Sequence, residues 1–478
     1  MPNAPHSLEP GAAEMREMLE LAGERIIDYI VSLPEQPAAD IEGSEALAAS
    51  LVESMPEQGQ RYEELLELLF GKLVQKGYNT AFGGALSYVP GGGLFHSAVA
   101  DLISLATNRY VNYWAAAPGL AQLEDNVVRW FCDMVGLPAS AGGVLTTGAS
   151  MGNLGALVTA RRERLGDSFL DGVLYVSEQV HHSIQKSAVI VGFSAKNFRV
   201  VPTDERFRIR VDVLEALVEK DLAAGLRPFC IVGNAGTTNT GAVDDLPALA
   251  ALARKHSLWF HVDAAYGGFF LLTPQGREAL RGMELADTVS LDPHKGLFLP
   301  FGTGCLLARD VAALERSHQV HSEYLTTAVR HGEGTGHRNI ADLGPEQSRE
   351  FRGLRVWLPL KMAGAQAFRS ALEEKLELTR WLAAEVGQMA HVEMVAEPQL
   401  SIFAFRFRPP GLDEAALDLL NQGLVDRVNE AGPVHLAGTS LRGHFVIRVC
   451  VLSVRTHRDV GETFLRLLRE AAASLVGA

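Results

Sequence analysis

The sequence predicts an α/β fold with a mostly parallel, helix-covered sheet, followed by a smaller α+β part. Between about residues 140 and 310, short apolar runs alternate with helix-length segments, which is typical of repeated strand–helix–strand units. Within this region, the apolar runs at 258–262 and 288–291 flank a helical segment and indicate two parallel strands. Beyond about residue 390, separated strands favour an antiparallel sheet.

The composition is that of an ordinary globular protein with a large core. The chain has 478 residues, of which 47% are hydrophobic and 21% charged, so we expect more than one domain. A formal net charge of −14 argues against nucleic acid or an anionic membrane as a partner, because both bind basic surfaces. The sequence shows no secretory signal, and its four cysteines lack CxxC spacing. These features favour a cytoplasmic protein with reduced cysteines and no membrane segment.

The first predicted part, residues 1–79, is an N-terminal helical segment. Apolar residues recur at helical spacing and stop before Pro34, which predicts a helix over 14–33. A second helix is predicted over 60–76. On sequence grounds alone, both helices could simply cover the core.

The second predicted part, residues 80–355, carries the parallel sheet, and the third, residues 356–478, is a small α+β domain. In the second part, GGVLTTGAS leads into MGNLGALVTARRER, and FCIVGNAGTTNTGAVDD leads into LPALAALARKH, each an apolar strand before a helix. A long helical stretch lies near 354–389. After it, the strand SIFAFRF alternates, so we expect its three phenylalanines on one face and Arg406 on a more polar face.

The two strands within 258–305 bring opposite charges together. Asp263 closes the first strand and Lys295 follows the second, and parallel neighbours present both ends at one edge of the sheet. Charges at strand ends are often only solvated loop residues. Pyridoxal 5'-phosphate (PLP) chemistry also needs this pair, because an amine binds the cofactor aldehyde as a Schiff base while a carboxylate keeps the pyridine nitrogen protonated.

The blocks around this pair resemble a known family. HVDAAYGG and DPHKG are similar to the PLP-dependent group II decarboxylases, which include aromatic-L-amino-acid, histidine and glutamate decarboxylases. The resemblance implies a fold-type I PLP-dependent transferase-like architecture and decarboxylation of an L-amino acid, of the aromatic class, to its amine and carbon dioxide. It assigns the Schiff-base lysine to Lys295, with His294 beside it, and the pyridine-nitrogen partner to Asp263. It also implies a homodimer in which the N-terminal segment packs on the second subunit.

Further blocks extend the expected cofactor site. TTGAS lies between a strand and a helix, where backbone amides and the helix dipole favour a phosphate, although a plain serine cap is the simpler alternative. The resemblance places the cofactor phosphate on Ala149 and Ser150. It places His181, the first histidine of SEQVHHSIQKSA, over the pyridine ring, where it can also carry a proton. Thr238 is expected near the ring, with Asp244 behind it.

The substrate pocket is inferred from the resemblance alone. YVPGGG, WAAAPG and SREFRGLRVW resemble family blocks that line this pocket, which assigns to it Tyr88, Pro90, Trp114 and Ser348. The hydroxyl of Ser348 favours a tyrosine-like substrate over tryptophan. Asn112 and Gly296 depart from the aromatic residues that several aromatic-selective relatives carry there. Tyr324 aligns with the tyrosine of a lid, which returns a proton to Cα after carbon dioxide leaves.

Other functions fit parts of the sequence. Residues 148–152 match G-x-S-x-G, with Ser150 as the nucleophile of a serine hydrolase, but this function would leave Lys295 without a role. A non-catalytic scaffold is a further class. A PLP-dependent aromatic aldehyde synthase shares the fold and the cofactor, and Tyr324 favours the decarboxylase over it. The histidines in the polar segment 317–347 have irregular spacing, so we expect no metal site.

Overall fold

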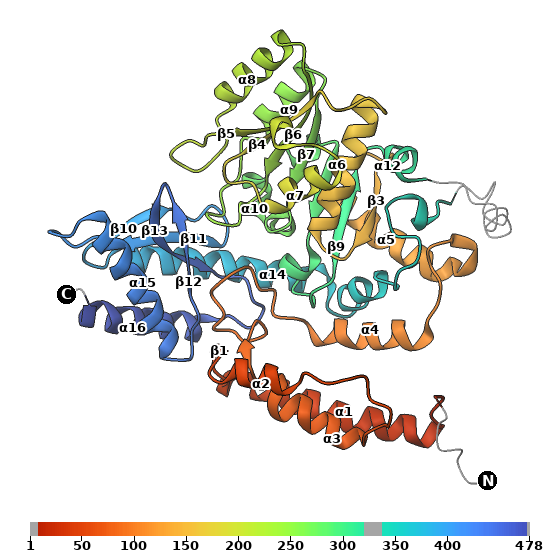
Figure 1. The fold of residues 1–478 in the computed structure, drawn as a ribbon, viewed down its shortest axis with the longest axis vertical. Coiled ribbons are helices and arrows are strands. Elements are labelled where there is room, and N and C mark those ends of the chain that lie inside the picture. The colour runs from red at the N-terminus through yellow and green to blue at the C-terminus, as the bar shows by residue number, and fades with distance from the viewer. Residues whose placement is uncertain (1–7, 320–336, 476–478) are drawn as a thin grey trace.

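The computed structural model describes residues 8–319 and 337–475. Figure 1 shows a central sheet with helices on both faces, a smaller sheet-and-helix part that holds the C-terminus, and a helical N-terminal segment. This architecture confirms the predicted α/β class with a smaller α+β part. The domain ranges 1–79, 80–355 and 356–478 stay predictions, and helix α14 (Gly353–Gly387) runs across the second boundary.

Seven strands form the central sheet in the order β3-β9-β8-β7-β6-β4-β5. The neighbours from β8 to β5 are parallel, whereas β9 is antiparallel to both β8 and β3. Residues 292–303 link β8 to β9 and hold only the short helix α11 (Pro293–Gly296), so no long crossover returns the chain for parallel pairing. The strands are β3 Gly142–Thr146, β4 Gly172–Ser177, β5 Phe198–Val201, β6 Arg227–Asn234, β7 Trp259–Asp263, β8 Thr288–Leu291 and β9 Gly304–Ala308.

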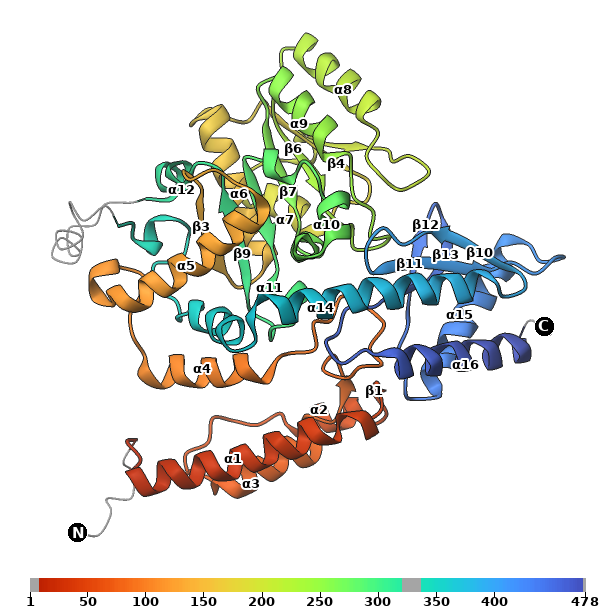
Figure 2. The same ribbon diagram turned by 180° about the vertical axis from the view of Figure 1, so that it is seen from behind.

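Helices cover both faces of this sheet, as the alternating pattern predicted. On one face, α6 (Ala149–Leu165) crosses β6 to β9, with α7 (His182–Ile190) and α12 (Val311–His318) beside it. The other face packs on α5, α8, α9 and part of α14. Figures 1 and 2 show the two helical layers from opposite sides. The remaining helices of this part are α4 Phe95–Thr107, α5 Pro118–Val135, α8 Val211–Ala223, α9 Leu246–Lys255 and α10 Pro274–Ala279.

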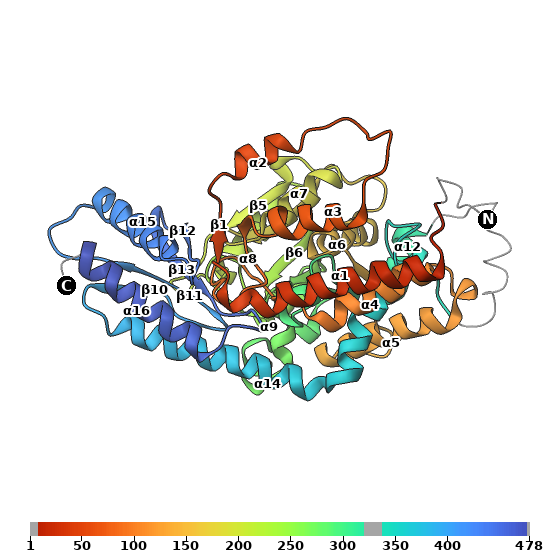
Figure 3. The same cartoon turned by 90° about the horizontal axis from the view of Figure 1, so that it is seen from below.

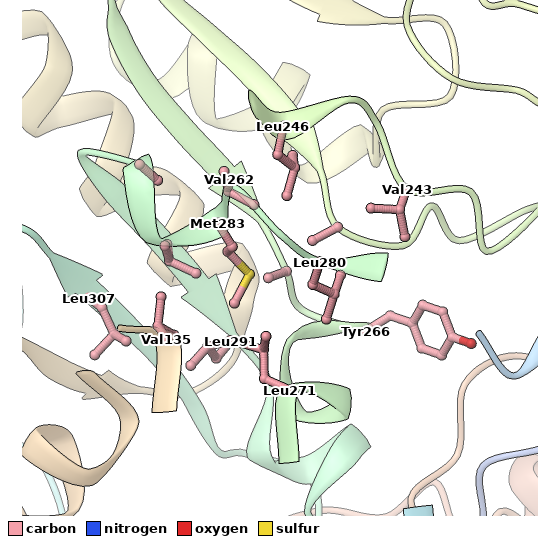
Figure 4. Packing of buried hydrophobic residues seen from close by; sticks show 14 of the residues in the cluster. Val135, Val243, Leu246, Val262, Tyr266, Leu271, Leu280, Met283, Leu291 and Leu307 are labelled. Carbon is pink, nitrogen blue, oxygen red and sulfur yellow. The ribbon is translucent and has the colours of Figure 1, made fainter. Parts of the chain in front are cut away.

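The larger hydrophobic core lies between the sheet and the second helical layer. Figure 4 shows Val262 of β7, Leu291 of β8 and Met283 packed together. Tyr266 lies at the edge of this cluster, and its hydroxyl is 2.9 Å from Ser401 Oγ in the C-terminal part. Buried, free thiols confirm the expectation of reduced core cysteines: Cys132, Cys230, Cys305 and Cys450.

The C-terminal part holds an antiparallel sheet in the order β10-β11-β13-β12. The three phenylalanines of β11 lie in one core with α14, α15 and α16, as predicted. The opposite face is less polar than expected, because Ala404 packs against the large part and Arg406 is buried in ion pairs with Glu414 and Asp418. The elements are β10 Val392–Ala396, β11 Ile402–Phe407, α15 Glu414–Glu430, β12 Ala437–Leu441, β13 His444–Cys450 and α16 Arg458–Leu475.

The N-terminal segment is the least buried part of the described chain. Helix α1 (Ala12–Ser32) confirms the helix predicted over 14–33, and none of its residues is buried. The second predicted helix differs, because α3 (Tyr62–Leu68) passes into the wider π-helical turn Leu69–Leu73. Figure 3 shows α1 and α3 side by side along the molecule. The other elements are β1 Ala39–Asp40, α2 Ser44–Ser50 and β2 Gly77–Tyr78.

Within residues 8–319 and 337–475, no helix is both long and apolar enough to cross a membrane.

Candidate active site

Strands β7 and β8 bring the predicted carboxylate and amine into one pocket. The strands pair in parallel, with Asp263 opposite Ser290, and the chain then enters α11, which carries Lys295. Both side chains therefore reach the carboxyl edge of the parallel strands. The pocket is lined by Ala149, Ser150, Asn153, His181, Ser183, Asn234, Gly236, Thr237, Thr238, Asp263, Ala265, Tyr266, Asp292 and Lys295.

Asp292 links Lys295 to the N-terminus of α6. Lys295 Nζ is 3.0 Å from Asp292 Oδ2, and Asp292 Oδ1 accepts a 2.6 Å hydrogen bond from Ala149 N. Asp292 thus occupies a helix terminus whose free amides favour an anion. His294 Nδ1 donates to the carbonyl of Thr303 at 2.7 Å, which holds its ring beside this terminus.

The turn from β3 to α6 has the form of a phosphate cradle. Ala149 and Ser150 are the first residues of α6, and both line the pocket. Thr146 Oγ1 donates to the carbonyl of Gly148 at 2.9 Å and fixes the turn. Gly304 passes so close to Gly148 that a Cβ on it would collide with the turn. The turn can therefore present backbone amides and the Ser150 hydroxyl to a phosphate.

The geometry gives no support to a serine hydrolase. Activation of a serine nucleophile requires a base within hydrogen-bonding distance. Across the described ranges, Ser150 Oγ has no hydrogen bond to a histidine. The pocket around Ser150 instead contains Lys295 and Asp263, the amine and carboxylate that PLP chemistry requires.

Asp263 is buried, and two donors hold its carboxylate. Oδ2 accepts from Asn153 Nδ2 at 3.0 Å, and Oδ1 accepts from the backbone N of Ala265 at 3.1 Å. His181 precedes α7, and its Nδ1 accepts from Ser183 N at 3.3 Å. Burial lowers the pKa of His181, while the negative charge of Asp263 opposes this shift. A neutral imidazole suits stacking on a pyridine ring.

Arg448 of the C-terminal part joins two of the predicted segments. Its Nε donates to the carbonyl of Thr238 at 2.8 Å, and its Nη1 donates to the carbonyl of Tyr88 at 2.7 Å. Thr238 lines the pocket. The Tyr88 ring stacks on His435, with 6.4 Å between ring centres, and does not line the pocket. Arg448 therefore fixes the backbone of both segments at the pocket edge.

The other predicted substrate residues also lie outside the pocket of their own chain. Gly91 packs on the carbonyl of His294, which places the loop of Pro90 against α11. Trp114 lines a separate pocket, where its ring stacks on His337 at 4.2 Å. Ser348 is exposed. These assignments stay predictions.

Tyr324, the predicted proton donor, falls in 320–336, outside the described residues.

Several pocket residues were missed by the sequence analysis. Asp292 stands in the DPHKG block but received no role. Asn153 follows Ser150 by three positions on α6, and this helical spacing could have indicated that it faces the same pocket. Ser183 and Asn234 gave no signal, because their places depend on how α7 and β6 pack against α6.

Asp244 lies behind the pocket. Its carboxylate accepts from the backbone N of Ile209 at 2.7 Å and of Asn234 at 2.8 Å. Burial raises the pKa of the Asp244 carboxyl group, whereas these two donors oppose the shift. Asp244 therefore holds the end of β6, from which Asn234 reaches the pocket wall.

The fold and the pocket are those of a PLP-dependent enzyme of the fold-type I class. The chain belongs to the pyridoxal-dependent decarboxylase family, since the model of the "Pyridoxal-dependent decarboxylase conserved domain" matches residues 47–408. It is a PLP-dependent amino-acid decarboxylase, as the motifs predicted. The groups present fit this cofactor, because a lysine amine, a fixed carboxylate and a helix N-terminus line one pocket.

Relatives and solved structures agree with this family. The chain is 35% identical to an aromatic-L-amino-acid decarboxylase from Bacillus atrophaeus, over 94% of both chains. It is 30% identical to tyrosine decarboxylase 4 from Petroselinum crispum, over 98% of this chain and 95% of the other. A crystal structure of Oryza sativa TDC with PLP and tryptamine superposes with a TM-score of 0.92 at 26% identity, covering 98% and 99% of the two chains. A phenylacetaldehyde synthase from Arabidopsis thaliana is 27% identical over 97% of this chain and 96% of the other.

Asp292→Asn should tighten PLP binding by about tenfold, which corresponds to about 1.4 kcal/mol. The Asp292 carboxylate accepts a hydrogen bond from the backbone amide of Ala149 at the start of α6. A phosphate bound at this helix terminus would bring a second negative charge beside the carboxylate, and the two charges would repel each other. Asparagine can still accept from Ala149 without that charge. Absorbance titration of the cofactor-free protein checks this, with Asp263→Asn as the matched change that should not tighten binding. Weaker binding to Asp292→Asn would show that the carboxylate assists the cofactor.

Proposed function

We propose that this decarboxylase converts an aromatic L-amino acid into the corresponding amine and carbon dioxide. The observation that carries the proposal is the meeting of Lys295 and Asp263 beside the N-terminus of α6. The named aromatic amino-acid decarboxylases among the relatives support the substrate class. PLP supplies the electron sink for the bond that breaks at Cα.

Each pocket residue has a distinct part in this proposal. Lys295 holds the cofactor and displaces the amine product. Asp263 faces the pyridine nitrogen, and its fixed position removes the need for reorganisation during the reaction. His181 lies on the ring face, with Thr238 at the ring edge. The phosphate lies on Ala149 and Ser150, with His294 beside it.

A panel of amino acids tests the substrate class. Tyrosine, phenylalanine, tryptophan, histidine and glutamate would be compared for release of carbon dioxide and amine. We expect the aromatic amino acids to react fastest. Turnover of glutamate alone would overturn the aromatic assignment.

We propose that Tyr324 protonates Cα after carbon dioxide leaves. Tyr324→Phe should then slow amine formation about 100-fold, because it removes a positioned general acid. Part of the product should become aldehyde, with peroxide and ammonia, since an unprotonated Cα remains open to oxygen. Product analysis measures this, with Tyr110→Phe as a control on an exposed tyrosine bonded to the Gln347 carbonyl. Abundant peroxide from the unmodified enzyme would favour the aldehyde synthase instead.

We also propose that the protein is a homodimer in the cytoplasm. Helix α1 exposes Leu19, Ile27 and Val31 to 54%, 53% and 73%, an apolar face that a second copy would cover. Trp114 and Ser348 lie outside the Lys295 pocket of their own chain. In a dimer, these residues of one copy would complete the part of the other copy's pocket that binds the substrate. A monomer in sedimentation velocity would rule this out. The free, buried cysteines support a reducing compartment, which cell fractionation tests.

Ser348 should favour tyrosine over tryptophan. A hydroxyl takes up space that an indole needs, and a pocket built to bond a polar group rejects substrates that lack one. Ser348→Gly should shift the ratio of kcat/KM for tryptophan over tyrosine upward by about tenfold. The ratio within each variant cancels differences in enzyme amount. A parent enzyme that already prefers tryptophan would end this assignment but leave the decarboxylase activity intact.

A further inference from the structure

One buried amide connects the two residues proposed to hold the cofactor ring. Asn153 lies on α6 and is 1% exposed. Its Nδ2 is 3.0 Å from Asp263 Oδ2 and 3.0 Å from Ser183 Oγ. Ser183 Oγ is in turn 2.7 Å from His181 Nδ1. The Asn153 amide therefore reaches Asp263 directly and His181 through Ser183.

A second run of hydrogen bonds holds the other end of the same amide. Asn153 Oδ1 is 3.0 Å from His261 Nε2, and His261 Nδ1 is 3.0 Å from Thr288 Oγ1. Trp259 Nε1 lies 2.9 Å from that same hydroxyl. Trp259 and His261 share one face of β7 because strand residues alternate, and His261 pairs with Thr288 across β7 and β8. Helix α6 covers this face, so a polar row lies buried beneath Asn153.

The two ends of the row together fix the direction of its hydrogen bonds. Trp259 donates to Thr288, because an indole N–H can only donate, and Asn153 turns its NH₂ group to Asp263, so its Oδ1 accepts from His261 Nε2. A neutral His261 therefore carries its proton on Nε2, and its Nδ1 accepts from the Thr288 hydroxyl. Burial lowers the pKa of His261 to about 4, so this neutral form is the one present at neutral pH.

The last group in the row fixes the orientation of the amide. An ionised carboxylate can only accept, so the NH₂ group of Asn153 must face Asp263. The second N–H of the same group points to Ser183, whose hydroxyl donates to His181 Nδ1. Both amide hydrogens and the amide oxygen of Asn153 are thus used, which leaves the side chain one orientation.

We propose that Asn153 is a positioning residue that sets the orientations of Asp263 and His181 together. It keeps the carboxylate aligned with the pyridine nitrogen while the imidazole stays over the ring, and His261 holds it in place from behind. The inference rests on the cofactor placement in the proposed function. A satisfied, buried network of this kind keeps polar groups preorganised.

Asn153→Leu tests the proposal. Leucine has a similar size, but it removes both the hydrogen bond to Asp263 and the hydrogen bond to Ser183 that leads to His181. We expect the Kd for PLP to rise about tenfold, because Asp263 loses one of its two donors. The circular dichroism induced in the cofactor band should fall to about half, since the ring loses its fixed setting. Neither readout depends on the substrate. Wild-type values for both would overturn the proposal.

Ser183→Ala is the matched control, because it removes only the branch to His181. The Kd for PLP should stay within about twofold of the wild type, while kcat falls several-fold. In the double variant Asn153→Leu/Ser183→Ala, the serine change should have no further effect on kcat, as expected for residues in one network. Equal changes in Kd for the two single variants would show that Asn153 does not act on Asp263.

His261→Leu keeps the test decisive if Asn153→Leu fails to fold. His261 has no hydrogen bond to Asp263 or His181, so its hydrogen-bonded route to both residues runs through Asn153, and the proposal predicts a change in cofactor dichroism by that route. His261→Gln, which can again donate to Asn153, should restore the signal. An unchanged signal in His261→Leu contradicts the proposal. A wild-type protein that takes up no PLP would instead refute the proposed function.

Discussion

Replacing Asp263 with alanine should remove most decarboxylation while leaving measurable PLP on the protein. The carboxylate stabilises the charge that develops on the ring more than it stabilises the resting cofactor, so the loss falls mainly on kcat. We expect kcat to decrease about 1,000-fold. Lys295 and the turn at the start of α6 remain to hold the cofactor. Carbon dioxide release and cofactor stoichiometry measure the two effects separately.

The control for Asp263→Ala is Asp287→Ala, a partly buried carboxylate at the opposite edge of the sheet. Asp287 Oδ2 accepts from the backbone N of Phe260 and takes no part in the cofactor pocket. Asp287→Ala should mainly lower the free energy of unfolding and should change kcat per folded molecule much less. Full turnover by Asp263→Ala would show that Asp263 is not the partner of the pyridine nitrogen.

Lys295→Ala should give the largest loss of all, with turnover reduced at least about 10,000-fold. Without the amine, the cofactor has no covalent attachment, and the product amine has no displacing group. PLP should then leave on dialysis, although the phosphate cradle still binds it weakly. Lys361→Ala is the matched control, because Lys361 lies on α14 outside the cofactor pocket. Substantial turnover by the Lys295 variant would disprove the assigned role.

The meeting of Asp263 and Lys295 could be predicted because it follows from local rules. Each residue ends or follows an apolar run, and parallel neighbours must present these ends at one edge. The antiparallel direction of β9 follows from the short linker after β8, whose length can be read from the sequence. Local patterns therefore predict which strand ends meet.

The network around Asn153 could not be predicted in the same way. Asn153, Ser183 and His261 come from α6, α7 and β7, and their contacts depend on how closely these elements pack. Gly152 permits that approach, because a Cβ there would lie 2.9 Å from Ser290 Oγ on β8. The periodic pattern of apolar residues along the sequence does not give the distance between two packed elements.

The face of β11 shows a related limit. Alternation placed Arg406 opposite the three phenylalanines, but alternation does not tell whether a face meets solvent. Glu414 and Asp418 of α15 neutralise Arg406, so the side chain is 3% exposed. A charged residue in a strand predicts a polar contact, which solvent or a neighbouring helix can provide.

Borohydride reduction of the holoenzyme, followed by peptide mapping, tests whether Lys295 is the residue that holds the cofactor. Reduction should fix the cofactor irreversibly to one lysine per chain, and the labelled peptide should contain DPHKG with the label on Lys295. Lys295→Ala should show no label under the same conditions. A label on another lysine, or a fully active holoenzyme in which no lysine is labelled, would show that Lys295 does not hold the cofactor.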